Sequence, residues 1–483
     1  MKLIIEARVE DADGQAGPPI VVGTVQRRDG NLADLGLSLA EGRSLLGQMQ
    51  STLVSVQAAR WLAQHVKCRR CGQALAHKDG RAIVVRTVFG KIAVPSPRLR
   101  ACHCVAGGQR HTFSPLCRAL VRRTTPELEC LQAKWAAHLP YRQANLLLKE
   151  VLPLDEVISF GATRRRILTV GKWLDQQVQH DIAQHRDREP ADVGVRQSKD
   201  VACVAVDSAW LTLYASPQTR RAERAEEERH PLRMKLVWSH HVNIVAGRAT
   251  FASRSPRLYG YVHKEVASAA DRLDQFLRAG GVQLDERVTV ISDDASEFVK
   301  AVQGSELARG HILDWFHIAM KFKAAENSVL GSKVIAPLEC DEVRARIRRS
   351  KWLVWHGKGG KAVARIKAID EELLARPGHE DSTLWWNLRR LYYYIENNAS
   401  TLVNYGARYR KGLPISSSIA ESAVNLLVSH RMAKKQQMRW TNEGAHCLVL
   451  VRAAALNGEL TPKRLATLSG ARCANDHQAR HAA

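Results

Sequence analysis

The sequence predicts an α/β protein with a long all-helical stretch, preceded by a helical region and a small cysteine-bearing module. Short β-branched runs alternate with helical patterns from about residue 200 onward. The stretch from about 319 to 412 is instead helical and rich in aromatic residues. Four cysteines lie close together in the sequence between residues 68 and 104. Alternating strands and helices favour a mixed sheet covered by helices, which sets the fold class.

The chain of 483 residues is long enough for about three domains. Residues 1–66 are expected to form an N-terminal helical segment. Its first 38 residues hold a short alternating stretch and then Gly, Pro and Asp clusters, so little regular structure is expected there. From Ser38 to His65 the apolar residues recur at helical spacing. Residues 67–120 are interpreted as a zinc-ribbon-like module, with two strands around a turn at Gly90.

A helical region is predicted over residues 121–190. Thr125-Pro126 is a helix start, because the hydroxyl can cap the helix and proline suits its first turn. Further turns are expected at three positions: Pro140, Pro153 and Gly161. The basic helix after the last turn carries three consecutive arginines: Arg164, Arg165 and Arg166. It is interpreted either as the recognition helix of a DNA-binding helix-turn-helix unit or as a solvated helix face.

Residues 187–200 are polar and charged and are predicted to form a linker. Strands are then expected in VACVAVDSAW, MKLVWSHHVNIVAG and RVTVISDD, with a charged segment at 219–230 between the first two. This α/β region is assigned to residues 200–460, and residues 461–483 form a tail. The order of the predicted strands and helices favours a mixed sheet with helices on its faces.

The cysteine pairs predict a structural zinc site. Cys68 and Cys71 have the spacing of a metal knuckle, and Cys102 and Cys104 follow about thirty residues later. Four thiolates satisfy the tetrahedral preference of Zn²⁺. The second pair departs from the usual spacing, so other residues remain alternative ligands: His103, His111 and Cys117. A cluster of reduced, buried thiols is the other interpretation.

Three acidic residues predict a second, magnesium-like site. Asp207 and Asp293 stand at or just after β-branched runs, and Glu421 lies in a helical stretch. Carboxylates from two strand ends and a helix can converge on a pair of hard divalent ions. Asp294 follows Asp293 directly, and only one of these acids can face the site because side chains alternate along a strand. Asp294 could equally be the N-cap of the helix that starts at Ala295.

Composition indicates a polyanionic partner. Lys and Arg number 72 against 48 Asp and Glu, a net charge of +24. A surplus of this size attracts a polyanion and makes its binding salt-dependent; the alternative is a protein that is merely basic. No apolar run approaches the roughly 20 residues of a membrane span, and no signal-like segment begins the chain. We therefore expect a cytoplasmic protein that performs phosphoryl transfer on nucleic acid.

Several motifs between Cys68 and Leu460 carry a family resemblance. They are CRRCG, RTVFGKIAVPSPR, RTTPELECLQAKWA, HILDWFHIAMKF, KWLVWHGKGGKA and GLPISSSIAESAVNLLVSHRMAKKQQMRW. On these stretches the chain resembles bacterial insertion-sequence transposases of the ISKra family, a DDE-type group related to Mutator-like transposases. The resemblance implies a ribonuclease H-like catalytic core with an all-helical insertion at about 319–412. It also implies an activity: cleavage of the element ends and strand transfer into target DNA.

The resemblance assigns Asp207, Asp293 and Glu421 as the catalytic ligands of Mg²⁺ or Mn²⁺. Asp314 and His317 match a supporting motif, although His317 is as well explained by a structural role. The residues expected to meet the DNA backbone are Arg431, Lys434, Lys435, Gln436, Gln437 and Arg439. Trp440 is expected either to stack on a displaced base or to serve as a buried anchor.

The implied partners are double-stranded DNA, both element ends and target, and further copies of the chain in a dimer or larger assembly. Two alternative functions stay open at this point. One is a DNA-binding relative without catalysis, such as a repressor or a domesticated transposase. The other is a structure-specific nuclease that cuts without joining.

Overall fold

The computed structural model describes most of the chain. The residues outside this description are 11–13, 29–34, 107–110, 121, 155–157, 187–201, 215–240, 252–253, 285, 287, 295, 381, 417, 433–438 and 468–483. Several predictions therefore lie outside the described residues: the linker at 187–200, the charged segment at 219–230, the first part of the second strand, most of the tail, and the DNA contacts Lys434, Lys435, Gln436 and Gln437.

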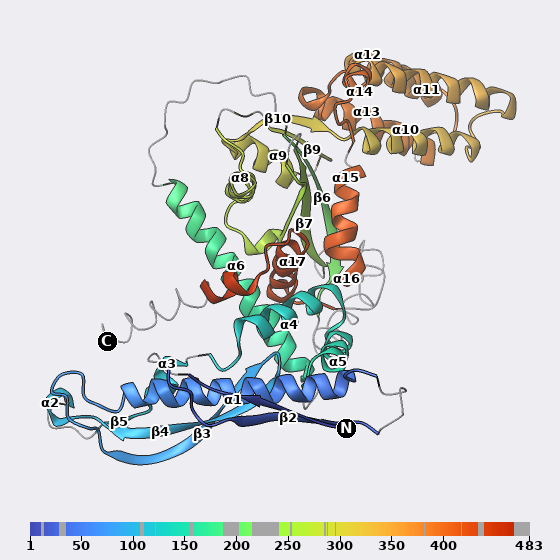
Figure 1. The fold of residues 1–483 in the computed structure, drawn as a ribbon. Helices are drawn as coiled ribbons and strands as arrows, with labels where there is room; N and C mark the ends of the chain where they lie inside the picture. Colours follow the sequence, from blue (N-terminus) through green and yellow to red (C-terminus); the bar gives the residue numbers. More distant parts are fainter. Residues whose placement is uncertain are drawn as a thin grey trace, which may run out of the picture. The chain divides into compact units, whose positions relative to one another are not determined.

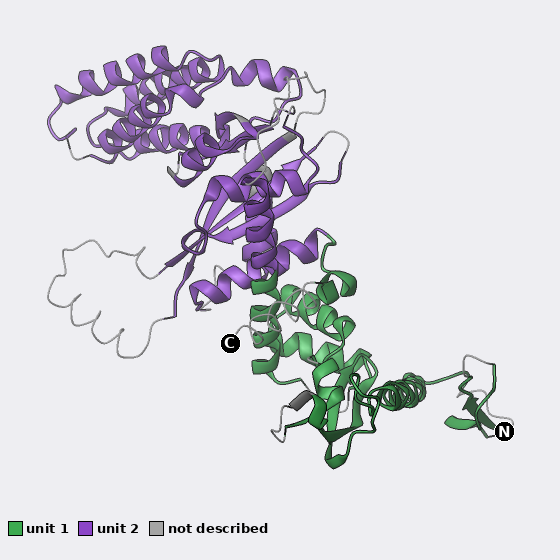
Figure 2. Ribbon diagram, turned by 90° about the vertical axis from the view of Figure 1, so that its left-hand side faces the viewer, with its two compact units in different colours: residues 1–173, 458–483 green, residues 174–457 purple. Residues whose placement is uncertain are grey.

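The chain divides into two compact units (Figure 2). Unit 1 comprises residues 1–173 and 458–483, and unit 2 comprises residues 174–457. The long helix α6 (Phe160–Arg186) contributes residues to both. Within the described part of the chain, no helix has both the length and the apolar character needed to cross a membrane.

Unit 1 begins with a hairpin that the sequence analysis missed. Strands β1 (Lys2–Ala7) and β2 (Ile20–Gln26) pair antiparallel, whereas little regular structure was expected. The alternating residues of β1 find their partners beyond the Gly- and Pro-containing segment, which concealed the pairing. Helix α1 (Leu39–Gln64) then begins with a capping box between Ser38 and Glu41. Arg27 binds Glu41 at 2.7 Å and so fastens the end of the hairpin to that helix start.

A three-stranded antiparallel sheet follows in unit 1. Its strands lie in the order β3 (His77–Thr87), β4 (Gly90–Arg100) and β5 (Thr112–Phe113). The predicted turn at Gly90 is confirmed: this residue has φ +114°, a conformation that glycine adopts without strain. Helix α1 covers one face of the sheet, where Ala58 packs with Ile83 and Ile92. Two short helices complete this part: α2 (His103–Ala106) and α3 (Pro115–Ala119).

The predicted helical region is observed in unit 1 as α4 (Pro126–His138), α5 (Tyr141–Val151) and the first half of α6. Thr125 is the N-cap residue of α4 and Pro126 stands in its first turn, as predicted. Gly161 lies inside the first turn of α6 rather than before it. A buried hydrogen bond of 2.7 Å from the Thr163 hydroxyl to the Asn145 side-chain oxygen joins α6 to α5.

Unit 2 contains a five-stranded mixed sheet, so the predicted mixed α/β class is confirmed (Figure 1). The strands are β6 (Ala202–Thr212), β7 (His241–Thr250), β8 (Arg257–Val262), β9 (Val288–Ser292) and β10 (Ala308–Leu313). Their spatial order is β10-β9-β6-β7-β8. The first three run parallel, and β7 and β8 continue the sheet as an antiparallel meander from β6.

Helices cover both faces of this sheet. On one face Val204 and Val290 pack with helices α8 (Ala269–Ala279) and α9 (Ser296–Gly304). Against the sheet also pack α15 (Ser418–Val424), the π-helical turn η5 (Asn425–Ser429) and α17 (Asn442–Leu456). Gly260 permits their close approach, because a Cβ there would stand 2.7 Å from a Val449 methyl carbon.

The remaining helices of unit 2 form a block of their own (Figure 1). They are α10 (Trp315–Leu330), α11 (Cys340–Trp355), α12 (Gly359–Leu374), α13 (Thr383–Asn397) and α14 (Tyr405–Arg410). Their shared core includes Phe322, Ile347 and Leu388, all fully buried. The all-helical stretch predicted for 319–412 is confirmed, and it begins slightly earlier, at Trp315, directly after β10.

Candidate metal centres

The first candidate site is built by two short loops in unit 1. The knuckle at Cys68–Cys71 is closed by backbone hydrogen bonds from Cys68 N to Gln73 O, 2.8 Å, and from Gly72 N to Cys68 O, 2.9 Å. Gly72 has φ +74°, which lets the chain turn back beneath the thiols. Cys102 and Cys104 stand where β4 ends and α2 begins. The strand pairing of β3 and β4 brings the two loops to the same end of the module.

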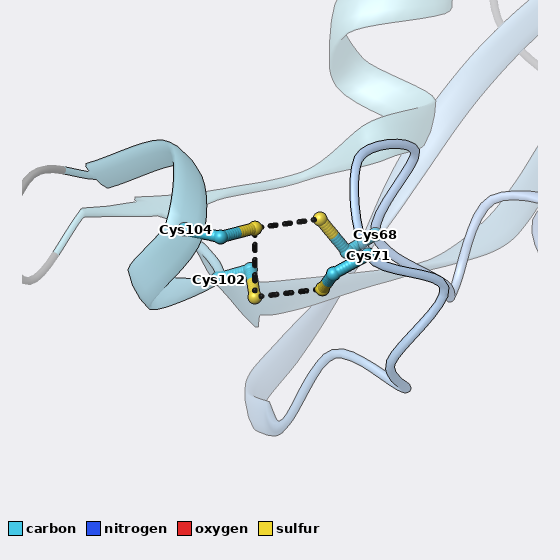
Figure 3. A group of neighbouring side chains, drawn as sticks. All are labelled: Cys68, Cys71, Cys102 and Cys104. Atoms are coloured by element: carbon cyan, nitrogen blue, oxygen red, sulfur yellow. Dashed lines mark hydrogen bonds between the residues drawn. The ribbon is translucent and has the colours of Figure 1, made fainter.

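The four sulfur atoms face one another (Figure 3). Sγ separations are 3.5 Å for Cys68–Cys104, 3.4 Å for Cys71–Cys102 and 3.4 Å for Cys102–Cys104. All four atoms lie within 4.8 Å of one another. A tetrahedral zinc with Zn–S bonds of about 2.3 Å requires sulfurs about 3.8 Å apart. This arrangement could bind a metal ion such as zinc after a small expansion.

Hydrogen bonds to the sulfurs shift the pKa values of two of the thiols in opposite directions. Backbone N–H groups of Cys71 and Arg70 point at the Cys68 sulfur and lower the pKa of that thiol to about 6. Bonds with Cys102 and Cys68 raise the pKa of the Cys104 thiol to about 12. One thiolate thus makes the next harder to form until a cation balances the charge. Among the described residues, the alternative ligand Cys117 lies apart, with its sulfur 3.5 Å from the Ser96 hydroxyl.

The second candidate site lies in unit 2, where the parallel pairing of three strands ends. Strands β9 and β10 end just before Asp293 and Asp314. Strand β6 instead continues past Asp207 to Thr212, so the prediction that Asp207 stands at a strand end is wrong. Ala205 on β6 is paired with Ile291 on β9, and Ile291 is paired with Ile312 on β10. Two residues further along each strand stand Asp207, Asp293 and Asp314. Because side chains alternate along a strand, the three acids occupy one row on the same face of the sheet. The chain thereby places three carboxylates side by side.

Burial differs along this row. Asp314 is fully buried and is the N-cap residue of α10, accepting a 2.9 Å hydrogen bond from the Phe316 N–H. Asp207 and Asp293 are half-buried, while the neighbouring Asp294 is exposed. Asp207 accepts a 2.7 Å bond from the Ser208 N–H. The exposure of these side chains agrees with the choice of Asp293 over Asp294 as the acid that faces the site.

His317 hydrogen-bonds to one acid of the row and interacts electrostatically with the other two. Its Nδ1 lies 2.7 Å from the Asp314 Oδ2, and the hydrogen bond raises the pKa of the imidazole. The negative charges of Asp293 and Asp207 act in the same direction, which places both carboxylates near the ring. Protonated His317 therefore balances part of the negative charge that the row collects.

Glu421 is delivered by a different element. Helix α15 packs against β6 and β7, as Figure 1 shows for β6, and the Glu421 side chain is exposed. The helix continues into the π-turn η5, whose widened geometry frees backbone carbonyls. The Arg452 guanidinium of α17 donates hydrogen bonds to two of them, on Leu426 and Leu427. This buried arginine holds the turn that follows Glu421 in place.

The three predicted catalytic acids do not form a compact ligand set as the four cysteines do. Among the described residues, the cysteines are the group whose ligand atoms all lie within 4.8 Å of one another. Asp207 and Asp293 stand in one row, whereas Glu421 comes from the helix beside it. The donor set is nevertheless suitable for a hard divalent cation, since all three ligands are carboxylates.

Tyr394 is a buried residue whose electrostatics involve the acids of this site, and sequence reasoning did not single it out. It lies on α13 in the helical block, and burial raises the pKa of its hydroxyl, with smaller contributions from the charges of Asp294, Asp293 and Asp314. The ammonium of Lys321 lies 4.1 Å from the centre of its ring. About a hundred residues separate Tyr394 from these acids in the sequence, and its Tyr-Tyr-Tyr context gave no signal of this interaction.

Two predicted DNA contacts are corrected by the structure. Trp440 is 9% exposed, and its indole N–H donates to Met432 O at 3.3 Å. Its backbone continues the sheet, donating to Thr212 O at 3.0 Å. Arg431 is also buried, at 3% exposure. Neither side chain can reach a DNA strand, so the buried-anchor interpretation of Trp440 is the appropriate one; Arg439 is exposed.

The three arginines of α6 divide into two groups. Arg164 and Arg165 are exposed, as a DNA-contacting residue must be. Arg166 is half-buried and forms an ion pair with Glu129 of α4, whose side chain is 1% exposed. Burial lowers the pKa of Arg166 to about 10. Arg166 is therefore part of the internal structure of unit 1.

Comparisons with known proteins identify no relative. No protein-family model matches the chain, and no curated protein matches it at a significant level.

Proposed function

We propose that this protein is a DDE-type DNA transposase of the ISKra kind, which cuts the ends of its element and joins them to target DNA. The observation that carries the proposal is the row of carboxylates within β6 and just beyond β9 and β10, with Glu421 on a helix that packs against β6 and β7. A net charge of +24 supports a nucleic-acid substrate.

The sheet topology supports a ribonuclease H-like core. Its first strand, β6, is central, with an antiparallel meander on one side and two parallel strands on the other. In such a sheet, ligands bind beyond the carboxyl ends of the parallel strands. Asp293 stands at that edge, and the helical block begins there too, directly after Asp314. Asp207 lies within β6, two residues past the last residue that β6 pairs with β9.

The chemistry follows from the residues. Asp207, Asp293 and Glu421 would hold Mg²⁺ or Mn²⁺ ions, which polarise the scissile phosphate and lower the pKa of bound water. Asp314 and His317 would orient the row through their 2.7 Å hydrogen bond.

The test is cleavage of DNA taken from the two flanks of the gene, with purified protein and Mg²⁺. We expect Asp207→Asn, Asp293→Asn and Glu421→Gln each to abolish cutting and joining while DNA binding persists. Asp294→Asn is the matched control, since this exposed acid lies next to the site. The proposal is wrong if all three variants cut as well as the wild type.

A second candidate function is a DNA-binding relative without catalysis, which the net charge of +24 also suits. Strand transfer separates the two. A wild-type protein that binds the flanking DNA but never joins it to a target is such a relative, whereas cutting without joining indicates a nuclease.

A further inference from the structure

Unit 1 contains a cavity of about 540 Å³ that the sequence analysis did not predict. The end of β3 and the start of β4 form one wall, and α4 and α6 form the others. Leu154 and Ile158 line the remaining side. This volume is within the range of cavities that hold small organic ligands, roughly 300–1,000 Å³.

Backbone contacts fix the walls of the cavity. Arg86 on β3 donates from its N–H to Arg123 O at 2.7 Å and accepts from Thr125 N at 2.9 Å, which ties the strand to the start of α4. At the hairpin tip, a Cβ on Gly90 would stand 3.2 Å from Pro153 O. The hairpin and the segment before α6 therefore approach each other closely, and glycine permits it. Such a cavity is formed before a ligand enters.

The lining is strongly basic. Four cationic side chains line the cavity: Arg86, Lys91, Arg165 and Arg166. None of the described lining residues is acidic. Hydroxyl and amide groups add hydrogen-bonding capacity, including those of Thr124, Ser159 and Gln132.

Arg166 provides a fixed positive wall. Buried Glu129 binds its guanidinium from one side, and the Thr124 hydroxyl lies 3.3 Å from its Nη2. Besides burial, the charge of Arg86 lowers the pKa of Arg166, so the two guanidinium groups lie close enough to repel. An anion placed beside both would relieve that repulsion. Arg86 and Arg165 form no ion pair with any carboxylate in the described part of the chain.

We propose that this cavity binds the phosphate of a nucleotide. Arg86, Lys91 and Arg165 would hold the phosphate oxygens, since guanidinium forks match that geometry. The apolar side chains of Leu128, Leu154 and Ile158 would contact the sugar or base. The inference rests on the proposed function for the source of the phosphate, a nucleotide within a DNA strand; a free nucleotide has the same chemistry.

The test measures binding by full-length protein without divalent metal, so that catalysis plays no part. The probes are a fluorescent single-stranded oligonucleotide, the same sequence as a duplex, and free dAMP. We expect Arg86→Ala and Arg165→Ala each to weaken binding of at least one probe about tenfold, the effect of a lost charged hydrogen bond. Arg165→Lys should retain more affinity than Arg165→Ala. Arg142→Ala, an exposed arginine on α5 outside the cavity, is the matched control.

The pattern of losses across the probes shows whether the bound phosphate belongs to a DNA strand or to a free nucleotide. Losses confined to the DNA probes support a nucleotide within a strand, and losses confined to dAMP support a free nucleotide. Equal affinity of the wild type, Arg86→Ala and Arg165→Ala for every probe overturns the inference. So does a loss for Arg142→Ala as large as that for Arg165→Ala. None of these results depends on whether the Asp207 and Asp293 variants cut DNA, so the two proposals fail independently.

Discussion

The two candidate metal centres differ in how far the protein alone assembles them. In unit 1 four sulfur atoms stand 3.4–3.5 Å from their neighbours. In unit 2 the three predicted acids come from two strands and a helix and do not form such a compact group. Thiols can be neutral and hydrogen-bond to one another, whereas ionised carboxylates repel at the same spacing. The protein can therefore preform the cysteine site, while the proposed carboxylate site would need a cation to close.

The largest expected effect concerns the preformed site. Cys68→Ser with Cys71→Ser should abolish zinc binding and unfold the β3–β5 module, since structural zinc contributes about 10 kcal/mol or more to small modules. Zinc content per chain and limited proteolysis of residues 67–120 measure this. Cys117→Ser, which alters a thiol outside the cluster, should retain the zinc. Full zinc content in the double variant would exclude the assignment.

The carboxylate row should behave in the opposite way. Asp293→Asn removes a repelling charge, so the thermal unfolding midpoint without metal should stay the same or rise. Cleavage should nevertheless fall by at least about a thousandfold, because metal ligands supply several kcal/mol of transition-state stabilisation. Calorimetry and the cleavage assay, run side by side, test both parts. A strongly lowered midpoint would show that Asp293 is a structural residue instead.

Two tryptophans of unit 2 can separate a buried anchor from a DNA contact. Trp440→Ala should lower the free energy of unfolding of unit 2 by about 3–5 kcal/mol, the usual cost of deleting a buried aromatic ring. Trp386→Ala is the control, because this side chain is 47% exposed on α13 and its loss should change stability little. Denaturant unfolding followed by fluorescence gives both values. Comparable stability of the two variants would contradict the buried anchor.

The smallest effect is a pH dependence at His317. Its pKa is raised in the folded protein, so its ion pair with Asp314 stabilises fully below the unfolded value near 6.5. That contribution is lost as pH rises through the folded-state pKa. The unfolding midpoint of His317→Gln should therefore fall further below the wild type at pH 6 than at pH 9. A difference independent of pH would show that the imidazole is neutral throughout.

Local patterns predicted much of this structure. β-Branched runs indicated β6 and β9, helical spacing indicated α1, and Thr125-Pro126 indicated the start of α4. The four cysteines were also found, although the spacing of Cys102 and Cys104 left other ligands open. These features depend on residues close in sequence, or on cysteine pairs whose spacing is typical of metal ligands.

The features that the sequence did not predict depend on contacts between residues far apart in the chain. The β1–β2 hairpin was missed because its pairing crosses a segment rich in Gly, Pro and Asp. Arg431 and Trp440 stand near a run of basic residues, and nothing local shows that Trp440 hydrogen-bonds to the end of β6. Tyr394 reaches the acids only through the packing of the helical block. The basic cavity joins residues from a hairpin and two helices, a combination without a sequence motif.

An Asp293→Cys variant tests most directly whether Asp293 binds a divalent ion during DNA cleavage. A thiolate is a poor ligand for Mg²⁺ and a better one for Mn²⁺. We expect this variant to be inactive with Mg²⁺ and to regain cleavage and strand transfer with Mn²⁺, while Asp293→Asn stays inactive with both. Wild-type activity of Asp293→Cys in Mg²⁺ would show that Asp293 is not a metal ligand.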